Sequence, residues 1–552
     1  MEATSSWTEC MWDVPRVRKF VPRMLPCPPS LRHPKREFVW NLLRSGRYPI
    51  LDESIEVQEM AVKCRQDVED VITSYHSLAP ILTVNPDELL HVERWCHSAL
   101  APVRRLPTDL LQEIFLCCLT DTYTRPNLQS APLLLCQVCF SWRSLCLSTP
   151  QLWSSIDLRD FRDSGSGLRS SLLPPTIVET WLARSGPTCP LSIRLCSHHP
   201  ESRTLLPIAL SHRDRWRKID LTFFARDAEF FLALLPSQDP TPLLEQLDIH
   251  FSLPFESLNP RAGFPPPSDH MSTLLQRLTS TRLTELNISG SYAYVLSLRE
   301  GIEMLSRCPN LVQCQLETKT ISEATSLLAR VRLNNLVSLE LRAESAEVAY
   351  LSLTLPRLQS LTVFTSQNPA IQPHIHLVSF LARSTPPLEY LHLSPPPASE
   401  DHLVECLENT PRLKELSLTK MYPLQSPHLQ CISDVMLSHL SASSSTGGYM
   451  ALTTHLYLLE VDGDLLCSPE GLTGMLISRW RRNAPEECDM RPALGTEAAP
   501  FAANISGTNA SGPSPFKLVV HSGTSYPLAR VKELLTGVEH QFIQDGRTVT
   551  IS

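Results

Sequence analysis

Three short stretches carry one pattern: Pro356-Arg-Leu-Gln-Ser-Leu-Thr-Val363, Pro386-Pro-Leu-Glu-Tyr-Leu-His-Leu393 and Pro411-Arg-Leu-Lys-Glu-Leu-Ser-Leu418. Two residues after the first proline of each stretch stands a leucine, and further apolar residues follow three and five positions after it. Alternating apolar and polar residues indicate a strand with one buried face. A proline at that place cannot continue a helix and favours extended backbone. The pattern therefore predicts short strands, each beginning just after a helix has ended.

The same pattern recurs along the C-terminal two-thirds of the chain. Eight copies begin 39, 28, 25, 22, 30, 25 and 43 residues apart, and five of them have the proline at the same place. Apolar periodicity predicts helices before several copies, at residues 271–278, 298–308, 323–331, 376–383 and 402–408. These repeat copies begin at Leu244, Leu283, Leu311, Leu336, Leu358, Leu388, Leu413 and Leu456, with degenerate copies at Trp153 and Trp216.

This succession of helix, proline and short strand resembles the leucine-rich repeat, although the asparagine of the ordinary motif is not systematically present. The resemblance implies an α/β fold: an irregular, curved leucine-rich-repeat solenoid with a parallel sheet on its concave side and uneven helices outside. A less regular α/β domain is the alternative. Polar residues between the apolar positions would face the concave side, where a somewhat acidic surface suits a target protein. The candidate target-binding residues are Glu285, Glu340, Gln359, Tyr390, His392 and Lys414.

A second informative stretch runs from Val103 to Leu119 and begins Val-Arg-Arg-Leu-Pro-Thr-Asp-Leu-Leu. Pro107 suits the first position of a helix, and Asp109 suits its positive first turn. The apolar residues that follow form one wide helical face. A second helix is expected to open at Ala131-Pro132 and to run past Trp142, before a stop at residues 149–150.

This stretch, with the later Leu-x-x-Val-Cys-x-x-Trp-Arg and Thr-Pro-x-Leu-Trp-x-x-Ile, resembles an F-box of the kind expanded in mushroom-forming fungi. The resemblance covers residues 103–156 and implies a three-helix module that docks onto the Skp-type adaptor of a cullin–RING ubiquitin ligase. Leu106 and Pro107 are the strongest candidates for direct contact, whereas Ile114 and Trp142 also suit the module's own core. The full set of adaptor-binding candidates is Leu106, Pro107, Leu110, Leu111, Ile114, Phe115, Val138, Trp142, Leu152 and Trp153.

Composition narrows the possible functions. The 552 residues are 42% hydrophobic, which suffices for a sizeable core, and the net charge of −8 argues against nucleic-acid binding. We see neither a signal peptide nor an apolar run that would span a membrane, so we expect an intracellular protein, cytoplasmic or nuclear, with reduced cysteines. Common nucleotide-binding and hydrolase motifs are missing, so we predict a non-catalytic protein without cofactor or metal.

Two functions follow as hypotheses. The first is a substrate receptor of a ubiquitin ligase, with the F-box-like module on the adaptor and the repeats on a target. The second is a non-catalytic scaffold whose module assembles no ligase.

The sequence predicts the following division of the chain: 1–45 mostly irregular; 46–102 amphipathic helices, over 51–77 and 87–100; 103–156 F-box-like module; 157–478 leucine-rich-repeat-like domain; 479–515 disordered; and 516–552 a cap with a strand at 516–521 and a helix at 527–538.

Overall fold

The chain divides into two compact units in the computed structural model. Unit 1 comprises residues 1–223 and 241–244, and unit 2 comprises residues 224–240 and 245–552. Each is described by itself. The structure describes residues 34–75, 86–119, 123–159, 173–196, 202–224, 227–234, 242–252, 269–278, 280–290, 296–319, 329–365, 374–397, 399–419, 430–441, 455–483 (without 463 and 466), 517–521, 530–531, 540–544 and 547–551.

The described part of unit 1 begins with three helices, α3 (Pro34–Ser45), α4 (Leu51–Tyr75) and α5 (Pro86–Ala99). The predictions of helices over 51–77 and 87–100 are confirmed. The prediction that residues up to 45 are mostly irregular is wrong for α3, and residues 1–33 lie outside the described ranges. Helix α3 forms because Val39 and Leu42 are buried with apolar residues of α4 and α5, and the rings of Trp40 and Trp95 lie 4.8 Å apart.

The F-box-like stretch folds into η2 (Pro102–Arg105), α6 (Thr108–Cys117), α7 (Leu135–Val138), α8 (Phe140–Ser148) and η3 (Pro150–Trp153). The predicted stop at residues 149–150 is confirmed. The expected second helix begins at Leu135 and not at Ala131-Pro132, where the chain forms a turn. It is also broken at Cys139, whose backbone is extended and whose Sγ accepts a hydrogen bond from the Trp142 backbone N–H at 3.4 Å. This thiol therefore has a structural role as the N-cap of α8.

Three parallel strands complete unit 1: β1 (Ser155–Asp157), β2 (Leu191–Cys196) and β3 (Trp216–Phe224). The helices between them are α9 (Pro175–Arg184), η4 (Ser202–Leu205), α10 (Leu206–Leu210) and η5 (Arg213–Arg215). The degenerate repeat copies are β1 and β3, whereas β2 escaped the sequence pattern because Pro190 stands three residues before Ile193, where the other copies have a large apolar residue.

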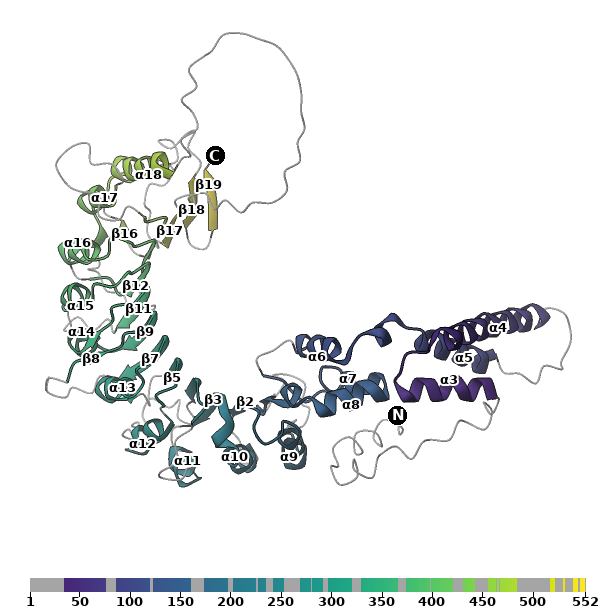
Figure 1. The fold of residues 1–552 in the computed structure, drawn as a ribbon. Helices are drawn as coiled ribbons and strands as arrows, with labels where there is room; N and C mark the ends of the chain where they lie inside the picture. Colours follow the sequence, from purple (N-terminus) through teal and green to yellow (C-terminus); the bar gives the residue numbers. More distant parts are fainter. Residues whose placement is uncertain are drawn as a thin grey trace, which may run out of the picture. The chain divides into compact units, whose positions relative to one another are not determined.

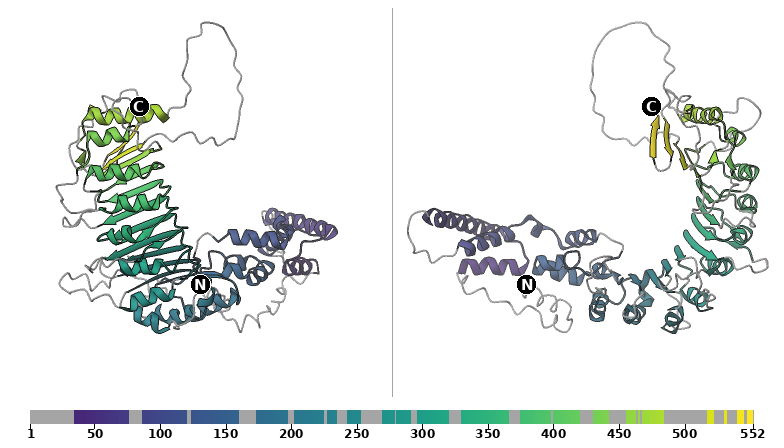
Figure 2. Two further views of the ribbon diagram at one scale, coloured as in Figure 1. Left: turned by 60° about the vertical axis from the view of Figure 1, so that its left-hand side comes forward. Right: turned by 180° about the vertical axis from the view of Figure 1, so that it is seen from behind.

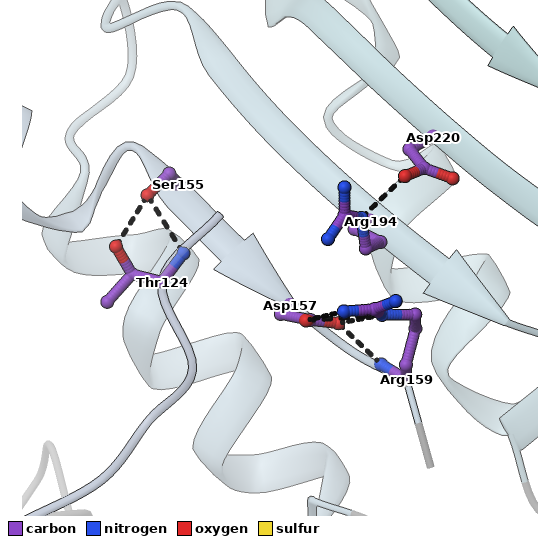
Figure 3. Close-up of polar contacts among 6 residues, drawn as sticks. All are labelled: Thr124, Ser155, Asp157, Arg159, Arg194 and Asp220. Atoms are coloured by element: carbon purple, nitrogen blue, oxygen red, sulfur yellow. Dashed lines mark hydrogen bonds and ion pairs between the residues drawn. The ribbon is translucent and has the colours of Figure 1, made fainter. Parts of the chain in front are cut away.

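Polar contacts join these strands to each other and to the segment before β1 (Figure 3). Arg194 on β2 donates to Asp220 on β3 at 2.5 Å, and its guanidinium lies 4.2 Å from the centre of the Tyr123 ring. The hydroxyls of Thr124 and Ser155 are 2.8 Å apart. Because Tyr123 and Thr124 lie in the middle of the F-box-like stretch, these contacts fasten the start of the sheet to that part of it.

Unit 2 is an α/β structure built on one large parallel sheet with helices along one of its faces (Figures 1 and 2). The strands follow in the order β4-β5-β7-β9-β11-β12-β13-β15-β17-β18-β19, and β19 alone in this order is antiparallel to its neighbour. Their bounds are β4 Gln246–Ser252, β5 Glu285–Gly290, β7 Gln313–Lys319, β9 Ser338–Ala343, β11 Ser360–Thr365, β12 Tyr390–Ser394, β13 Glu415–Leu418, β15 Leu458–Asp462, β17 Lys517–His521, β18 His540–Gln544 and β19 Arg547–Ile551.

The helices of unit 2 and its short strands alternate with these long strands. The helices are α11 (Ala228–Leu234), α12 (Asp269–Leu278), α13 (Leu298–Leu305), α14 (Glu347–Ser352), α15 (Leu377–Ser384), α16 (Glu400–Glu408), α17 (Asp434–Leu440) and α18 (Pro469–Asn483). The predicted helices near 271, 298, 376 and 402 are confirmed. The short strands are β6 (Leu296–Ser297), β8 (Val331–Arg332), β10 (Leu353–Thr354), β14 (Gln430–Ile432) and β16 (Asp464–Leu465).

The leucines of the repeat copies stack in register. Leu361 of β11 pairs with Leu339 of β9 on one side and with Leu391 of β12 on the other. The first leucine of every copy is also buried. Along the strands, buried apolar residues alternate with partly exposed residues, as in β9 and β11. All eight predicted strands are therefore present, and they share one apolar face under the helices.

Three predictions near the chain's later segments need correction or lie outside the described residues. Residues 479–483 belong to α18 and are not irregular, because the buried Arg479 donates to the carbonyls of Leu440 and Leu456 at 2.6 and 3.4 Å. The helix expected at 323–331 is wrong for its described residues, because 329–330 are irregular and Val331 begins strand β8. Residues 323–328 lie outside the described ranges, as does most of the segment 527–538. The strand predicted at 516–521 is confirmed as β17.

Substitution Leu391→Ala tests the stacked leucines. Leu391 is fully buried between two neighbouring strands, so we expect a loss of about 2–5 kcal/mol in the free energy of unfolding. The measurement is urea unfolding followed by circular dichroism. The control Gln359→Ala changes an exposed residue and should stay within about 0.5 kcal/mol. Equal effects of the two changes would contradict this account.

A buried histidine joins α14 to the end of β12. The Tyr350 hydroxyl lies 2.7 Å from Nδ1 of His374, whose Nε2 is 2.8 Å from the carbonyl oxygen of Pro395. A carbonyl only accepts, so Nε2 carries the proton and the tyrosine donates to Nδ1. Burial lowers the pKa of His374 to about 4. The site therefore holds a neutral imidazole.

Stability should fall on acidification because of this histidine. The unfolded chain takes up the proton near pH 6.5 and the folded chain only near pH 4, so the unfolded state holds more protons in this window. We expect His374 to contribute about 3 kcal/mol of stability that is lost as the pH falls from about 6.5 to about 4. Urea unfolding at several pH values compares the protein with His374→Gln, whose slope should be smaller. Parallel slopes would refute the assignment.

Candidate functional site

Helix α6 presents two different apolar faces. Leu111 and Phe115, four residues apart, are buried, and the Phe115 ring centre lies 4.8 Å from that of Trp142. Leu110 and Ile114, also four residues apart, are 53% and 45% exposed. Residues at this spacing share one side of a helix. One side of α6 therefore belongs to the core, and the aliphatic side chains of the other side are exposed.

The remaining adaptor-binding candidates fall into the same two groups. Val138 is 56% exposed and Pro107 is exposed, whereas Leu106 and Trp142 are half-buried. Leu152 and Trp153 are fully buried. The buried candidates stabilise the module from within, and they present no surface to a partner in this structure. Of the two residues with an open assignment, Ile114 lies on the exposed side and Trp142 contacts the core.

Trp153 connects the module to the following helix. Its Nε1 donates to the carbonyl of Cys146 at 2.8 Å, its ring packs edge-on against Trp181 at 4.8 Å, and the guanidinium of Arg184 lies 4.6 Å from its ring centre. Because the Trp153 indole is buried and its N–H is hydrogen-bonded, this side chain stabilises the packing around it. The closing Leu-Trp of the F-box-like motif is thus a core element of unit 1.

Sequence reasoning missed two exposed residues of this stretch. Leu134 and Phe140 are each 46% exposed. Together with Val103, Leu110, Ile114 and Val138 they make up half of the large apolar side chains found exposed in the described residues. Leu134 is the N-cap of the short helix α7, and Phe140 is the first residue of α8, directly after the break at Cys139, which no sequence pattern indicated.

The second candidate site is the polar face of the unit 2 sheet. Register aligns Glu340, Thr362, His392, Ser417 and Glu460 on the neighbouring strands β9, β11, β12, β13 and β15. A second row contains Ser360, Tyr390 and Glu415. These positions alternate with the buried leucines, so their side chains lie on the face away from the helices.

The predicted target-binding residues are distributed unevenly over this polar face. Tyr390 and His392 lie at its centre and Glu340 two strands away, whereas Glu285 lies on the more distant β5. Gln359 is exposed just before β11. Lys414 forms an ion pair with Glu389 at 2.7 Å. The structure therefore groups Glu340, Tyr390 and His392, and it leaves Glu285 apart from them.

Aromatic and charged side chains contact each other at this centre. The His392 Nε2 is 2.8 Å from the Thr419 hydroxyl, and its ring lies edge-on to Phe364 at 5.0 Å. The guanidinium of Arg342 lies 4.3 Å from the Phe364 ring centre and donates to Glu340 at 2.9 Å. Burial lowers the pKa of His392, while the nearby Glu460 and Glu340 act in the opposite direction.

Two glutamates that the candidate list omitted complete the polar face. Glu415 accepts a hydrogen bond from the Tyr457 hydroxyl, and this bond, with burial, raises the pKa of Tyr457. Glu460 accepts from the Ser417 hydroxyl at 2.6 Å. Burial raises the pKa of Tyr390, and the negative charges of Glu460 and Glu415 raise it further. Glu460 lies inside the last repeat copy, at Leu456, so the repeat pattern contained the signal that would have found it.

Two comparisons of the sequence with known proteins found no match. No protein-family model matches the chain, and no curated protein is similar to it at a significant level. Within the described ranges, no group of three His, Cys, Asp or Glu side chains is arranged to hold a metal ion. Every helix of the described residues is too short or too polar to cross a lipid bilayer.

Paired substitutions on α6 distinguish its two faces. Phe115→Ala removes a fully buried ring and should lower the free energy of unfolding by about 3–5 kcal/mol. Ile114→Ala removes a side chain that is already 45% exposed and should cost about 1 kcal/mol or less. Thermal unfolding followed by tryptophan fluorescence measures both. A larger loss from Ile114→Ala would show that the exposed side of α6 is part of the core.

Proposed function

We propose that this protein is the substrate-recognition subunit of a Skp/cullin/F-box ubiquitin ligase. Its F-box-like module, residues 103–156, docks onto the adaptor, and its repeats bind a target protein. The protein makes and breaks no covalent bond itself. Its contribution to ubiquitin transfer is to hold the target close to the enzyme that modifies it, which raises the effective concentration of the target's lysines. We propose that it acts in the cytoplasm or nucleus.

The exposed side of α6 is the observation that carries this proposal. Leu110 and Ile114 lie within the stretch whose residues resemble an F-box, and both are about half exposed. Exposed aliphatic side chains concentrated in one segment are typical of a surface that a partner covers. Covering them removes apolar area from water, at about 25 cal/mol per Å².

The repeats suit the second half of the proposal. We propose that unit 2 is an irregular leucine-rich-repeat domain whose polar sheet face recruits the target. The described helices of unit 2 occupy the opposite face of the sheet (Figure 2), so among the described residues the strands form this face. Side chains projecting from paired strands are held rigidly by the backbone ladder, which lowers the entropy lost on binding.

A scaffold without ligase activity is the alternative. In that case the module either does not bind the adaptor or binds it without neddylated cullin. The exposed apolar side chains of α6 favour an interacting module over an isolated one, and they do not distinguish a ligase from an adaptor-bound scaffold.

Co-purification with the adaptor tests the proposal. The full chain is co-expressed with a Skp-type adaptor and compared with Leu110→Glu/Ile114→Glu. Because both side chains are about half exposed, the variant should fold while its docking surface gains two charges that would have to be desolvated in the complex. We expect adaptor binding to fall by about a hundredfold or more.

The matched control places the same charges on another exposed apolar helix side. Leu51 and Ile55 on α4 are 78% and 50% exposed and are also four residues apart, so Leu51→Glu/Ile55→Glu should retain the adaptor. Retention of the adaptor by the α6 variant would contradict the proposed docking surface. If the unaltered protein does not bind the adaptor, the ligase function is refuted; if it binds but never recovers neddylated cullin, the scaffold function replaces it.

A further inference from the structure

We propose that the polar face of strands β9 to β15 binds a positively charged segment of a protein, with arginine or lysine side chains set among the glutamates and aromatic rings around Tyr390. The inference deepens the proposed function, because it states the chemistry of the target that the repeats recruit. The binding itself can be measured without adaptor or ligase.

Charge is the first argument. On the polar face of strands β9 to β15, counting the residue just before each strand, the side chains that the structure describes carry four carboxylates and two cationic groups, and strands β4 to β7 add four further carboxylates. The carboxylates belong to Glu245, Asp248, Glu285, Glu317, Glu340, Glu389, Glu415 and Glu460, and the cations to Arg342 and Lys414. A surface with this excess of one sign attracts the opposite charge and repels nucleic acid.

The second argument is that neutral donors hold several of these carboxylates. Glu415 is bonded by the Tyr457 hydroxyl, Glu460 by the Ser417 hydroxyl, and Glu317 by the backbone N–H of Gly290 at 2.9 Å. The bonds to Glu415 and Glu317 orient these two carboxylates without neutralising their charge. Within the described residues, neither Glu317 nor Glu415 forms an ion pair. A cation from a partner would therefore meet oriented negative groups and lose little entropy on binding.

Aromatic rings are the third argument. Tyr390 lies between the strands that carry Glu340 and Glu460, and both carboxylates act on its hydroxyl. A guanidinium or ammonium group is attracted both to the face of such a ring and to a nearby carboxylate. This face already contains one example, since Arg342 lies over Phe364 and pairs with Glu340. A partner's arginine could make the same pair of contacts beside Tyr390.

The dimensions suit a short peptide segment. Strands β9, β11, β12, β13 and β15 are neighbours, and neighbouring strands lie about 4.8 Å apart, so the distance from the β9 row to the β15 row is about 19 Å. An extended segment of about six residues covers that distance. In such a segment every second side chain points toward the sheet, which places about three cationic side chains opposite Glu340, Glu415 and Glu460.

Peptide binding to the full-length protein tests the inference. The probes are two pools of fluorescein-labelled peptides of about twelve residues, long enough to cross the strands with both ends free. One pool has arginine at every second position and randomised neutral residues between, and the other has glutamate at the same positions. Fluorescence anisotropy should show that the arginine pool binds more tightly by about tenfold or more, and that its binding weakens as salt increases.

Glu415→Gln/Glu460→Gln is the decisive variant. Glutamine can still accept the hydrogen bonds from Tyr457 and Ser417, so the face keeps its structure and loses two negative charges. We expect the arginine pool to bind about tenfold more weakly. The matched control, Glu405→Gln/Glu408→Gln, removes two exposed charges from α16 on the helical side and should change binding by less than about twofold.

Several results would overturn the inference. They are equal binding of the two pools, no binding of either pool, or equal weakening by both double variants. Adaptor co-purification is run on the same preparations, so the two proposals can fail separately. Loss of peptide selectivity with adaptor binding intact refutes only the cationic target, whereas loss of adaptor binding with peptide selectivity intact refutes only the ligase.

Discussion

Apolar side chains in register across neighbouring parallel strands are the interaction on which unit 2 depends. Leu339, Leu361, Leu391 and Leu416 occupy one row, and each is nearly or fully buried. A strand that slipped by one residue would turn its leucines to the polar side and its glutamates into the core. The buried rows therefore determine which residues lie on the polar face of the sheet.

The polar face follows from this constraint. Because side chains alternate along a strand, every buried leucine places its neighbour on the open side of the sheet. Parallel pairing then brings together residues that are far apart in the chain, such as Glu340 and Glu460 around Tyr390. Hydroxyl groups of Tyr457 and Ser417 hold two of the carboxylates in place. The chemistry of the face thus depends on the stacking of the core behind it.

The F-box-like stretch shows a different relation between sequence and structure. Its apolar spacing predicted the helix around Leu110 to Phe115, and α6 is present. Spacing did not separate the two sides of that helix, because Leu110, Leu111, Ile114 and Phe115 are all large and apolar. Burial against Trp142 and the following segments assigns Phe115 to the core, and only the remaining side can meet another protein.

The sequence by itself determined the strands of the repeat copies, most of the helices before them and the alternation of buried and polar positions, because these depend on residues a few positions apart. It missed β2, the break at Cys139 and the helical part of residues 34–45. Those features depend on contacts with distant segments, as when Trp40 packs against Trp95. Tertiary structure alone decided which glutamates lie beside Tyr390 and which side of α6 is exposed, because register and burial bring together residues that no local pattern relates.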